Sequence, residues 1–228
     1  MLPVPISEGS ANDFMPEHNF TVVKNLRHFI AEDAKTARRF LKWFGYQPIT
    51  QAQITLLNEH TRGSEITSLL DPIMAGNDMG LMSDAGCPGI ADPGADVVKL
   101  AHQRGVDVVP LVGPSSIVLS IMASGFNGQN FSFTGYLPID KPLKIKRLRE
   151  LELMAQKQSQ AQFFIETPYR NMQLLETMLE TLQPATLLFV GTDITSPGQK
   201  LLVRTIAAWK KSTLPELHKV PTVFGIYK

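Results

Sequence analysis

The spacing of hydrophobic and polar residues along the chain predicts short strands that alternate with helices. Compact apolar runs of the length expected for buried strands lie at residues 28–31, 54–57, 79–82 and 106–112. Apolar positions recur at helical spacing over residues 19–26, 34–43, 65–75 and 95–101. Such an alternation is typical of a parallel sheet covered by helices, so this part of the chain is predicted to be an α/β domain.

The pattern changes from Phe131 onward. Residues 131–136 alternate between apolar and polar, and Pro138 ends the run. Further strand candidates lie at 162–165, 185–190, 201–203 and 220–227, with a polar helix near 141–150 and a helix over 172–182. Because Pro221 cannot donate to a sheet ladder, the last of these runs is predicted to lie at an edge or a bulge. We predict two α/β domains, residues 1–112 and 113–228.

The first nine residues form an apolar piece that is short for a central strand. Pro3 and Pro5 each remove a ladder donor, so its second half is predicted to be a loop whose carbonyls point into a cleft. A frayed terminus is an equally weighted alternative.

Two loops rich in small residues follow predicted strands. The first, residues 80–94, contains three glycines and two prolines after its apolar lead-in, and a helix begins just behind Pro93 and Gly94. The second, Gly113-Pro114-Ser115-Ser116, opens another helix, and its first amides and the Ser115 and Ser116 hydroxyls could bind a carboxylate or a hydroxyl group. Paired loops at successive strand ends are typical of the ligand-facing edge of an α/β sheet, although a plain crossover loop is the simpler alternative. We expect the turns near residues 86 and 114 to face each other across a crevice.

Two acidic pairs are candidates for proton transfer or for holding a hydroxyl group. Glu32 and Asp33 follow the strand at 28–31, but Asp33 is equally well placed to cap the next helix. Glu59 and His60 lie in the polar loop after the strand at 54–57, where an exposed histidine more often has no role. For each pair, a chemical role and a purely structural role therefore both remain possible interpretations.

Composition limits the classes of partner. The formal net charge is +1, so any contact with nucleic acid must be local. The five cations Lys141, Lys144, Lys146, Arg147 and Arg149 provide one such local cluster, with a solvated helix face as the alternative. The single cysteine, Cys87, fits a reducing compartment, no apolar run reaches membrane-spanning length and no secretion signal is visible, so we expect a cytoplasmic protein.

Several familiar motifs are missing from the sequence. There is no G-x-G-x-x-G after a strand, no G-x-x-x-x-G-K-[ST] and no G-x-S-x-G. The five histidines and Cys87 show no metal-ligand spacing, so no metal is expected. Cys87 has no base beside it in the sequence and is predicted to be a small neutral filler rather than a nucleophile.

The loops Ser83–Gly94 and Gly113–Ser116 make the chain resemble the tetrapyrrole-methylase-fold family of S-adenosylmethionine-dependent methyltransferases. The nearest branch is the one that methylates a cytidine ribose 2′-hydroxyl in small-subunit ribosomal RNA. Four further stretches agree with that branch: 31–33 with Arg38, 58–60, 133–138 and 166–170. The resemblance covers nearly the whole chain.

The resemblance implies two α/β domains, with S-adenosylmethionine in the cleft between them and a homodimer. It assigns the acceptor side, with its catalytic groups, to Glu32, Asp33, Glu59 and His60. It assigns contacts with the RNA backbone to Lys144, Lys146, Arg147 and Arg149. It assigns the cofactor to Pro5, Ser83, Asp84, Ala85, Gly86, Pro88, Ile90, Gly113, Pro114, Ser115, Ser116, Thr167 and Pro168.

Two other functions compete with rRNA methylation. A methyltransferase acting on a small molecule such as a tetrapyrrole fits the low net charge, whereas the basic run 141–149 disfavours it. The second competing function is that of a non-catalytic module that binds the cofactor or RNA. The predicted function is methyl transfer from S-adenosylmethionine to ribosomal RNA.

Overall fold

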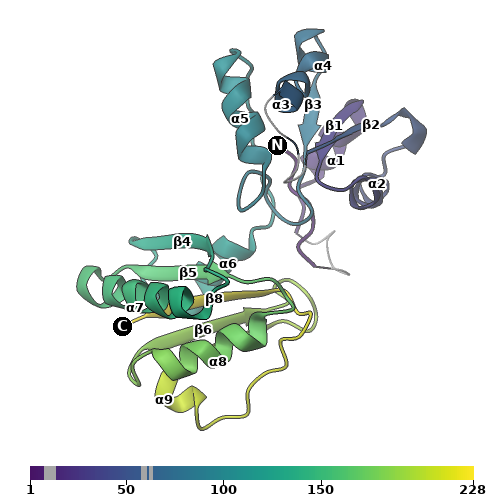
Figure 1. The fold of residues 1–228 in the computed structure, drawn as a ribbon. Helices are drawn as coiled ribbons and strands as arrows, with labels where there is room; N and C mark the ends of the chain where they lie inside the picture. Colours follow the sequence, from purple (N-terminus) through teal and green to yellow (C-terminus); the bar gives the residue numbers. More distant parts are fainter. Residues whose placement is uncertain (8–13, 58–60, 62–63) are drawn as a thin grey trace. The chain divides into compact units, whose positions relative to one another are not determined.

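The chain forms two compact units, Met1–Ser115 and Ser116–Lys228. The computed structural model describes residues 1–7, 14–57, 61 and 64–228. Each unit has its own sheet: unit 1 has three strands in the order β2-β1-β3, and unit 2 has five in the order β4-β5-β8-β6-β7 (Figure 1). The protein is therefore of the α/β class, as predicted.

Unit 1 contains a parallel sheet of short strands. Its elements are α1 (Glu17–Asn25), β1 (His28–Ala31), α2 (Ala34–Trp43), the 3₁₀ helix η2 (Ile49–Gln51), β2 (Gln53–Leu56), α3 (Ser64–Ser68), α4 (Asp71–Met74), β3 (Met79–Leu81) and α5 (Gly94–Gln103). β1 pairs in parallel with both β2 and β3. Separate buried clusters lie around Phe29, next to α1 and α2, and around Ile30, next to α3 and α5. Successive residues of β1 thus serve opposite faces of the sheet.

Two sequence-based predictions in unit 1 are wrong. The helix expected over 65–75 is divided into α3 and α4, and Pro72 lies in the first turn of α4. The apolar run 106–112 is not a strand. Within it, Val109 and Val112 are 62% and 75% exposed, and Pro110 has no amide hydrogen. This run lacks a full-length neighbouring strand among the described residues.

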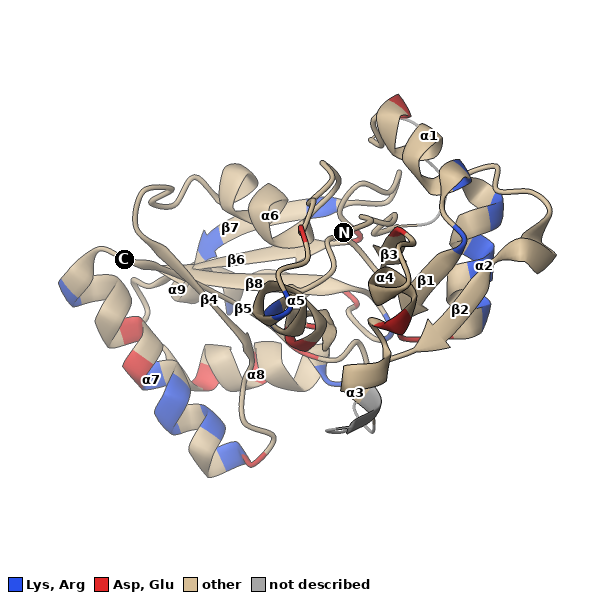
Figure 2. Ribbon diagram, turned by 90° about the horizontal axis from the view of Figure 1, so that it is seen from above, with Lys and Arg blue, Asp and Glu red and all other residues tan. Residues whose placement is uncertain are grey.

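Unit 2 contains a mixed sheet covered on both faces. Its elements are α6 (Ser116–Ser124), β4 (Phe131–Tyr136), α7 (Lys141–Gln158), β5 (Ala161–Ile165), α8 (Asn171–Thr181), β6 (Leu187–Thr192), β7 (Lys200–Thr205), α9 (Ile206–Trp209) and β8 (Thr222–Tyr227). β4 and β5 are parallel, and the other neighbouring strands are antiparallel. α7 and α8 lie on one face and α6 on the other (Figure 2). The larger core lies under α7, α8 and α9, with Phe164, Trp209 and Phe224 fully buried.

Glycines of the central strands make room for aromatic rings. A Cβ atom on Gly225 would stand 2.7 Å from the Phe163 ring, and one on Gly191 would stand 2.7 Å from the Phe189 ring. The edge position predicted from Pro221 is wrong, because β8 lies in the middle of the sheet. The proline directly precedes the first paired residue, Thr222, so no ladder bond is lost.

Among the described residues, no helix combines the length and the hydrophobicity needed to cross a bilayer.

Candidate functional site

The central loop after β3 is held in shape by its own side chains. The Ser83 hydroxyl donates to the carbonyl of Ala85 (3.0 Å). The Asp92 carboxylate accepts from the amides of Gly89 (2.8 Å) and Gly94 (2.7 Å), which closes the loop just before α5. Asp84, Ala85 and Ile90 are exposed, so part of this fixed loop faces solvent.

Residues 1–7 and the start of the second small-residue loop, Gly113–Ser115, meet the central loop within unit 1. Val4 and Gly86 exchange two backbone hydrogen bonds, of 2.9 and 3.2 Å. Gly86 has φ +73°, a conformation that favours glycine. Gly113 packs so closely on Pro3 that no Cβ atom would fit there. The structure thus brings three predicted cofactor segments together.

The two turns near residues 86 and 114 face each other but touch directly. The Cys87 sulfur is 3.4 Å from the carbonyl oxygen of Pro114 and 3.8 Å from that of Gly113. The crevice expected between the turns is therefore closed at this point by a small thiol. Burial raises the pKa of Cys87, which keeps the sulfur protonated and supports its role as a neutral filler. A ligand would have to lie along the exposed rim of the loops.

A buried side chain of α1 also holds the backbone just before the second loop. Asn19 of α1 is 2% exposed, and its amide nitrogen donates to the carbonyl of Val112 (2.8 Å). Pro114 is buried, and Ser115 ends unit 1. Ser116 begins α6 in unit 2. The backbone before the two serines is therefore fixed by a buried side chain.

Glu32 is the acidic residue that the fold brings to the central loop. Its Oε1 accepts from the backbone amide of Asp84 (3.1 Å), although 52 residues separate the two. Burial raises the pKa of Glu32, and the charges of Asp84 and Asp92 add to this, while the hydrogen bond from Asp84 opposes it. Glu32 is therefore a stronger base than an ordinary glutamate, which suits it to accepting a proton.

Asp84 and Asp33 complete the acidic group, with different roles. Asp84 is exposed, yet partial desolvation of its carboxyl group and the charge of Asp33 raise its pKa, against the attraction of Arg39. Asp33 accepts a hydrogen bond from the amide of Thr36 (2.7 Å) and caps α2. The hydrogen bonds from Thr36 lower the pKa of Asp33, which makes this carboxylate a weaker base than Glu32. The predicted pair Glu59 and His60 lies outside the described residues.

In unit 2, the predicted cofactor residues Thr167 and Pro168 follow β5 and are held by Glu166. This carboxylate is fully buried and accepts from Arg170 (2.6 Å) and from the Thr167 amide (2.8 Å). Burial alone would raise the pKa of Glu166, but the bonds and charges of Arg170, Thr167 and Lys144 together lower it. Pro168 lies in the turn that leads into α8.

The predicted RNA-binding cations of α7 divide into two kinds. Lys146 and Arg149 are exposed, and Arg147 lies 3.2 Å from Glu150. Lys144 is 2% exposed, and its ammonium lies 3.5 Å from Glu166 Oε2. Lys144 is therefore a partner of a buried carboxylate and does not suit RNA binding, which corrects the prediction.

A second basic surface is on α2. Lys35, Arg38, Arg39 and Lys42 follow one another at helical spacing, and all four are exposed (Figure 2). The helix contains no acidic residue. Sequence reasoning missed this basic surface, although the i, i+3, i+4, i+7 spacing of the cations would have revealed it. It begins directly after Glu32 and Asp33.

Among the described residues, no group of three or more His, Cys, Asp or Glu side chains could hold a metal ion.

Comparison with known proteins places the chain near a set of methyltransferases. It is 32% identical to ribosomal RNA small subunit methyltransferase I of Vibrio cholerae over 80% of this chain, and 30% identical to the protein of that name from Bacillus subtilis over the same share. The Escherichia coli O157:H7 protein is 26% identical over 92% of this chain and is covered over 71% of its own length. The chain spans 59% of the length of the Vibrio cholerae and Bacillus subtilis proteins. No profile of a known protein family matches the chain.

The fold is that of a known methyltransferase structure. The crystal structure of the methyltransferase CobJ superposes with a TM-score of 0.61 at 18% identity, covering 95% of this chain and 89% of that one. The resemblance inferred from the two loops is therefore confirmed, both in sequence and in fold.

Proposed function

We propose that this chain is an S-adenosylmethionine-dependent methyltransferase that 2′-O-methylates a cytidine ribose in small-subunit ribosomal RNA. The observation that carries the proposal is the similarity to rRNA small subunit methyltransferase I proteins over most of the chain. Convergence of the small-residue loops with Glu32 in unit 1 supports it. An rRNA substrate would place the reaction in the cytoplasm.

The loops of unit 1 suit a zwitterionic cofactor. They offer peptide groups and serine hydroxyls, and the backbone at Gly86 comes close to its neighbours, since a Cβ there would stand 3.1 Å from the Ile6 side chain. Residues Pro5, Ser83–Gly86, Pro88, Ile90, Gly113–Ser116, Thr167 and Pro168 would hold it. When bound, the cofactor supplies an electrophilic methyl group, so the protein must align the acceptor and remove its proton.

Glu32 is our candidate for the general base. Its carboxylate is half-buried and its raised pKa increases its basicity, whereas Asp33 is committed to the helix cap. Glu32 would accept the proton of the ribose hydroxyl as the oxygen attacks. Glu59 and His60 stay predicted members of the acceptor side.

The RNA backbone would contact cations of the two basic helices, of which Arg147 is half-buried beside Glu150 and the others are exposed. These are Lys146, Arg147 and Arg149 on α7 and Lys35, Arg38 and Lys42 on α2. Each phosphate contact contributes to affinity and to its salt dependence. The homodimer implied by the resemblance stays a prediction that light scattering would test.

The test is transfer of a labelled methyl group to small ribosomal subunits that lack the modification. We expect transfer by the native chain, a loss of about 10²–10⁴-fold in kcat for Glu32→Gln, and no change for the exposed control Glu17→Gln. No transfer by the native chain to subunits or to isolated rRNA would contradict the proposal. Transfer only to a small molecule would favour the competing acceptor class, and cofactor binding without any turnover would favour a binding module.

A further inference from the structure

Tyr169 is an exposed aromatic residue in the turn between β5 and α8. It is 69% exposed, although two side chains from a distant segment of unit 2 lie beside it. The His218 ring stands 6.0 Å from the Tyr169 ring at an angle of 72°, and the Lys219 ammonium lies 6.0 Å from the ring centre. Both neighbours are exposed. Tyr169, His218 and Lys219 therefore form an open aromatic and basic surface, the Tyr169 platform.

The backbone on both sides of Tyr169 is bonded to the segment that carries its two neighbours. The Lys219 amide donates to the Pro168 carbonyl (3.1 Å). The side-chain amide of Asn171, which is fully buried, donates to the Val220 carbonyl (2.7 Å). The residues just before and after the ring are thus fixed, and the two segments of the platform are held together.

The turn itself is closed from below by Glu166. Its buried carboxylate accepts from the Thr167 amide (2.8 Å) and from the Arg170 guanidinium (2.6 Å), and the Arg170 amide donates to the Thr167 carbonyl (2.9 Å). A side chain on a turn that is fixed in this way loses little conformational freedom when it binds a ligand. The turn therefore presents the Tyr169 ring in a defined position.

The backbone of Lys219 has a conformation that lysine rarely adopts. Its φ is +62°, in the left-handed region where glycine is the favoured residue. Residues held in such conformations carry an energetic cost and gather at functional sites. A glycine would fit here without strain but would remove the ammonium group beside the Tyr169 ring. The lysine therefore indicates a use for its side chain.

An exposed ring with a cation beside it suits an unpaired nucleobase of RNA. Every base has a flat face that stacks on tyrosine, and a lysine next to the ring reaches the phosphate of the stacked nucleotide. Tyr169 follows the carboxyl end of β5, and Tyr136, which is 55% exposed, ends the parallel neighbour β4. Two exposed tyrosines thus mark the same end of this sheet, and the carboxyl ends of parallel strands are where α/β sheets bind ligands.

We propose that Tyr169, with His218 and Lys219, forms a stacking site for an unpaired base of the RNA substrate. The inference rests on the proposed function, because it takes the acceptor to be RNA, and it adds a base contact to the phosphate contacts of the two basic helices. Tyr169 stacks on the base, and Lys219 contacts a phosphate beside it. The platform binds and orients RNA and takes no part in proton transfer.

The first experiment measures the affinity of native and variant chains for a fluorescein-labelled RNA hairpin with an unpaired cytidine in its loop. Tyr169→Leu keeps an apolar side chain but removes the aromatic face, so it should raise the Kd about 5- to 150-fold. Tyr169→Phe keeps the ring and should change the Kd by less than about twofold. The matched control Phe131→Leu, at the opposite end of β4 and 45% exposed, should leave the Kd unchanged.

The second experiment tests the role of Lys219 through the salt dependence of RNA affinity. Lys219→Met should reduce the slope of log Kd against log salt concentration by about 0.7–0.9, the share of one phosphate contact. The exposed control Lys157→Met, on α7, should leave the slope as it is in the native chain. An unchanged slope in Lys219→Met would overturn the phosphate contact.

The outcome for Tyr169 decides the proposal. Equal Kd values for Tyr169→Leu and the native chain would overturn it, and so would the absence of any binding of the native chain to the hairpin and to small ribosomal subunits. A loss confined to S-adenosylmethionine affinity, measured by calorimetry, would also overturn it, because the ring would then stack on the adenine of the cofactor.

Methyl transfer to small ribosomal subunits separates this inference from the proposed function. Tyr169→Leu should raise the KM for subunits and leave kcat unchanged, as expected when binding alone is lost. Transfer by the native chain with the same KM in Tyr169→Leu would overturn the stacking site and leave the function intact. RNA binding that depends on Tyr169 without any transfer would contradict the function and keep the stacking site.

Discussion

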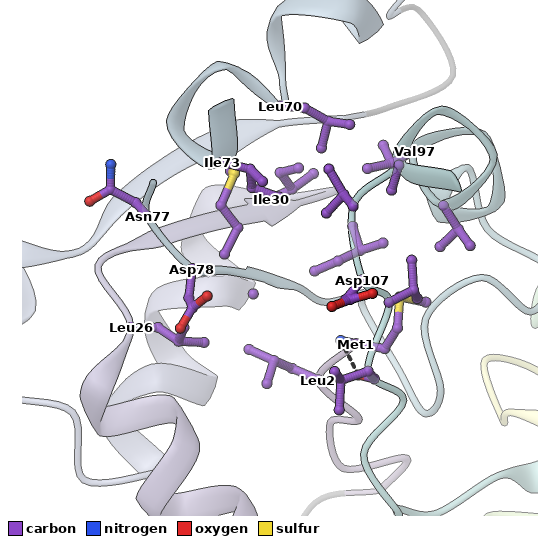
Figure 3. A pocket seen from close by; sticks show the side chains of 18 of the residues that line it. Met1, Leu2, Leu26, Ile30, Leu70, Ile73, Asn77, Asp78, Val97 and Asp107 are labelled. Carbon is purple, nitrogen blue, oxygen red and sulfur yellow. Dashed lines mark hydrogen bonds between the residues drawn. The ribbon is translucent and has the colours of Figure 1, made fainter. Parts of the chain in front are cut away.

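The two sheets differ in how completely they are paired. In unit 2, five strands lie side by side, helices cover both faces, and the larger core is one contiguous cluster from Leu137 to Ile226. In unit 1, three short strands divide two smaller clusters, and the edge strand β3 borders an apolar groove that Leu2 and Ile30 help to line (Figure 3). The residues suited to chemistry, Glu32 and the small-residue loops, lie mainly in the less completely paired unit. We infer that unit 2 supplies most of the stability and unit 1 most of the site.

The two units should differ most in the unfolding free energy that is lost when a buried side chain is removed from each. Trp209 is fully buried in unit 2 and its indole N–H donates to the Leu188 carbonyl (3.0 Å). Trp209→Ala should lower the free energy of unfolding by about 3–5 kcal/mol. Leu2→Ala should cost only about 2 kcal/mol, because Leu2 already borders an open groove. Guanidinium denaturation measures both changes, and equal losses would remove the proposed difference between the units.

The buried ion pair of unit 2 should give the next largest effect. Lys144→Met leaves the Glu166 carboxylate buried with only Arg170 as a charged partner, and we expect a loss of about 3 kcal/mol. The double variant with Glu166→Gln should recover part of that loss. The exposed control Lys157→Met on the same helix should change stability by less than about 0.5 kcal/mol.

The same pair predicts the pH dependence of stability. Because the folded-state pKa of Glu166 is lowered, its contribution is complete above the ordinary value of 4.5 and is lost as the pH falls through the folded-state value. The native chain should therefore lose more stability between pH 5 and pH 3 than Glu166→Gln does. If the native chain and Glu166→Gln lose the same stability between pH 5 and pH 3, Glu166 does not titrate as proposed.

Adding a methyl group at a closely packed glycine should also lower stability more in unit 2 than in unit 1. Gly225→Ala must displace the fully buried Phe163 ring and should cost about 1–3 kcal/mol. Gly80→Ala meets mainly the end of the Leu2 side chain, which borders the groove, and its Cβ would stand 3.0 Å from the Phe29 ring, so we expect a smaller loss. Thermal unfolding would compare the two, and a larger loss for Gly80→Ala would indicate that the groove is less adaptable than described.

The smallest effect concerns the exposed helix cap in unit 1. Asp33→Ala should cost about 1 kcal/mol and speed amide exchange at the start of α2, whereas Asp33→Asn should cost little because asparagine caps equally well. Both variants should retain methyl transfer. A loss of turnover in Asp33→Asn beyond about a hundredfold would instead make Asp33 the general base.

The elements that the sequence predicted best are those whose signals are local. β1 and α2 have the predicted bounds, since a four-residue apolar run is followed by the cap Asp33 and the helix terminator Gly45. The run at 106–112 has an equally strong pattern, yet a strand also needs a neighbour, and in the described part of the chain this run shares ladder-type backbone bonds with Met1 alone. Local pattern thus predicts the capacity to form a strand but not its pairing.

The site was predictable in its residue types more than in its contacts. The small-residue loops are brought together as expected, yet the direct contact through Cys87 could not be read from residues 26 positions apart. Lys144 and Lys146 look alike in a basic run, and only the position of Glu166 after β5 decides which of them is buried. The link between Glu32 and the Asp84 amide depends on β1 and β3 being neighbours, which the order of the chain does not specify.

Cys87 is the only cysteine in the sequence, and its sulfur lies against the Pro114 carbonyl. Because this thiol fills the space between the two turns, its alkylation should be slow, and faster alkylation after methyl donor is added would show that the turns separate.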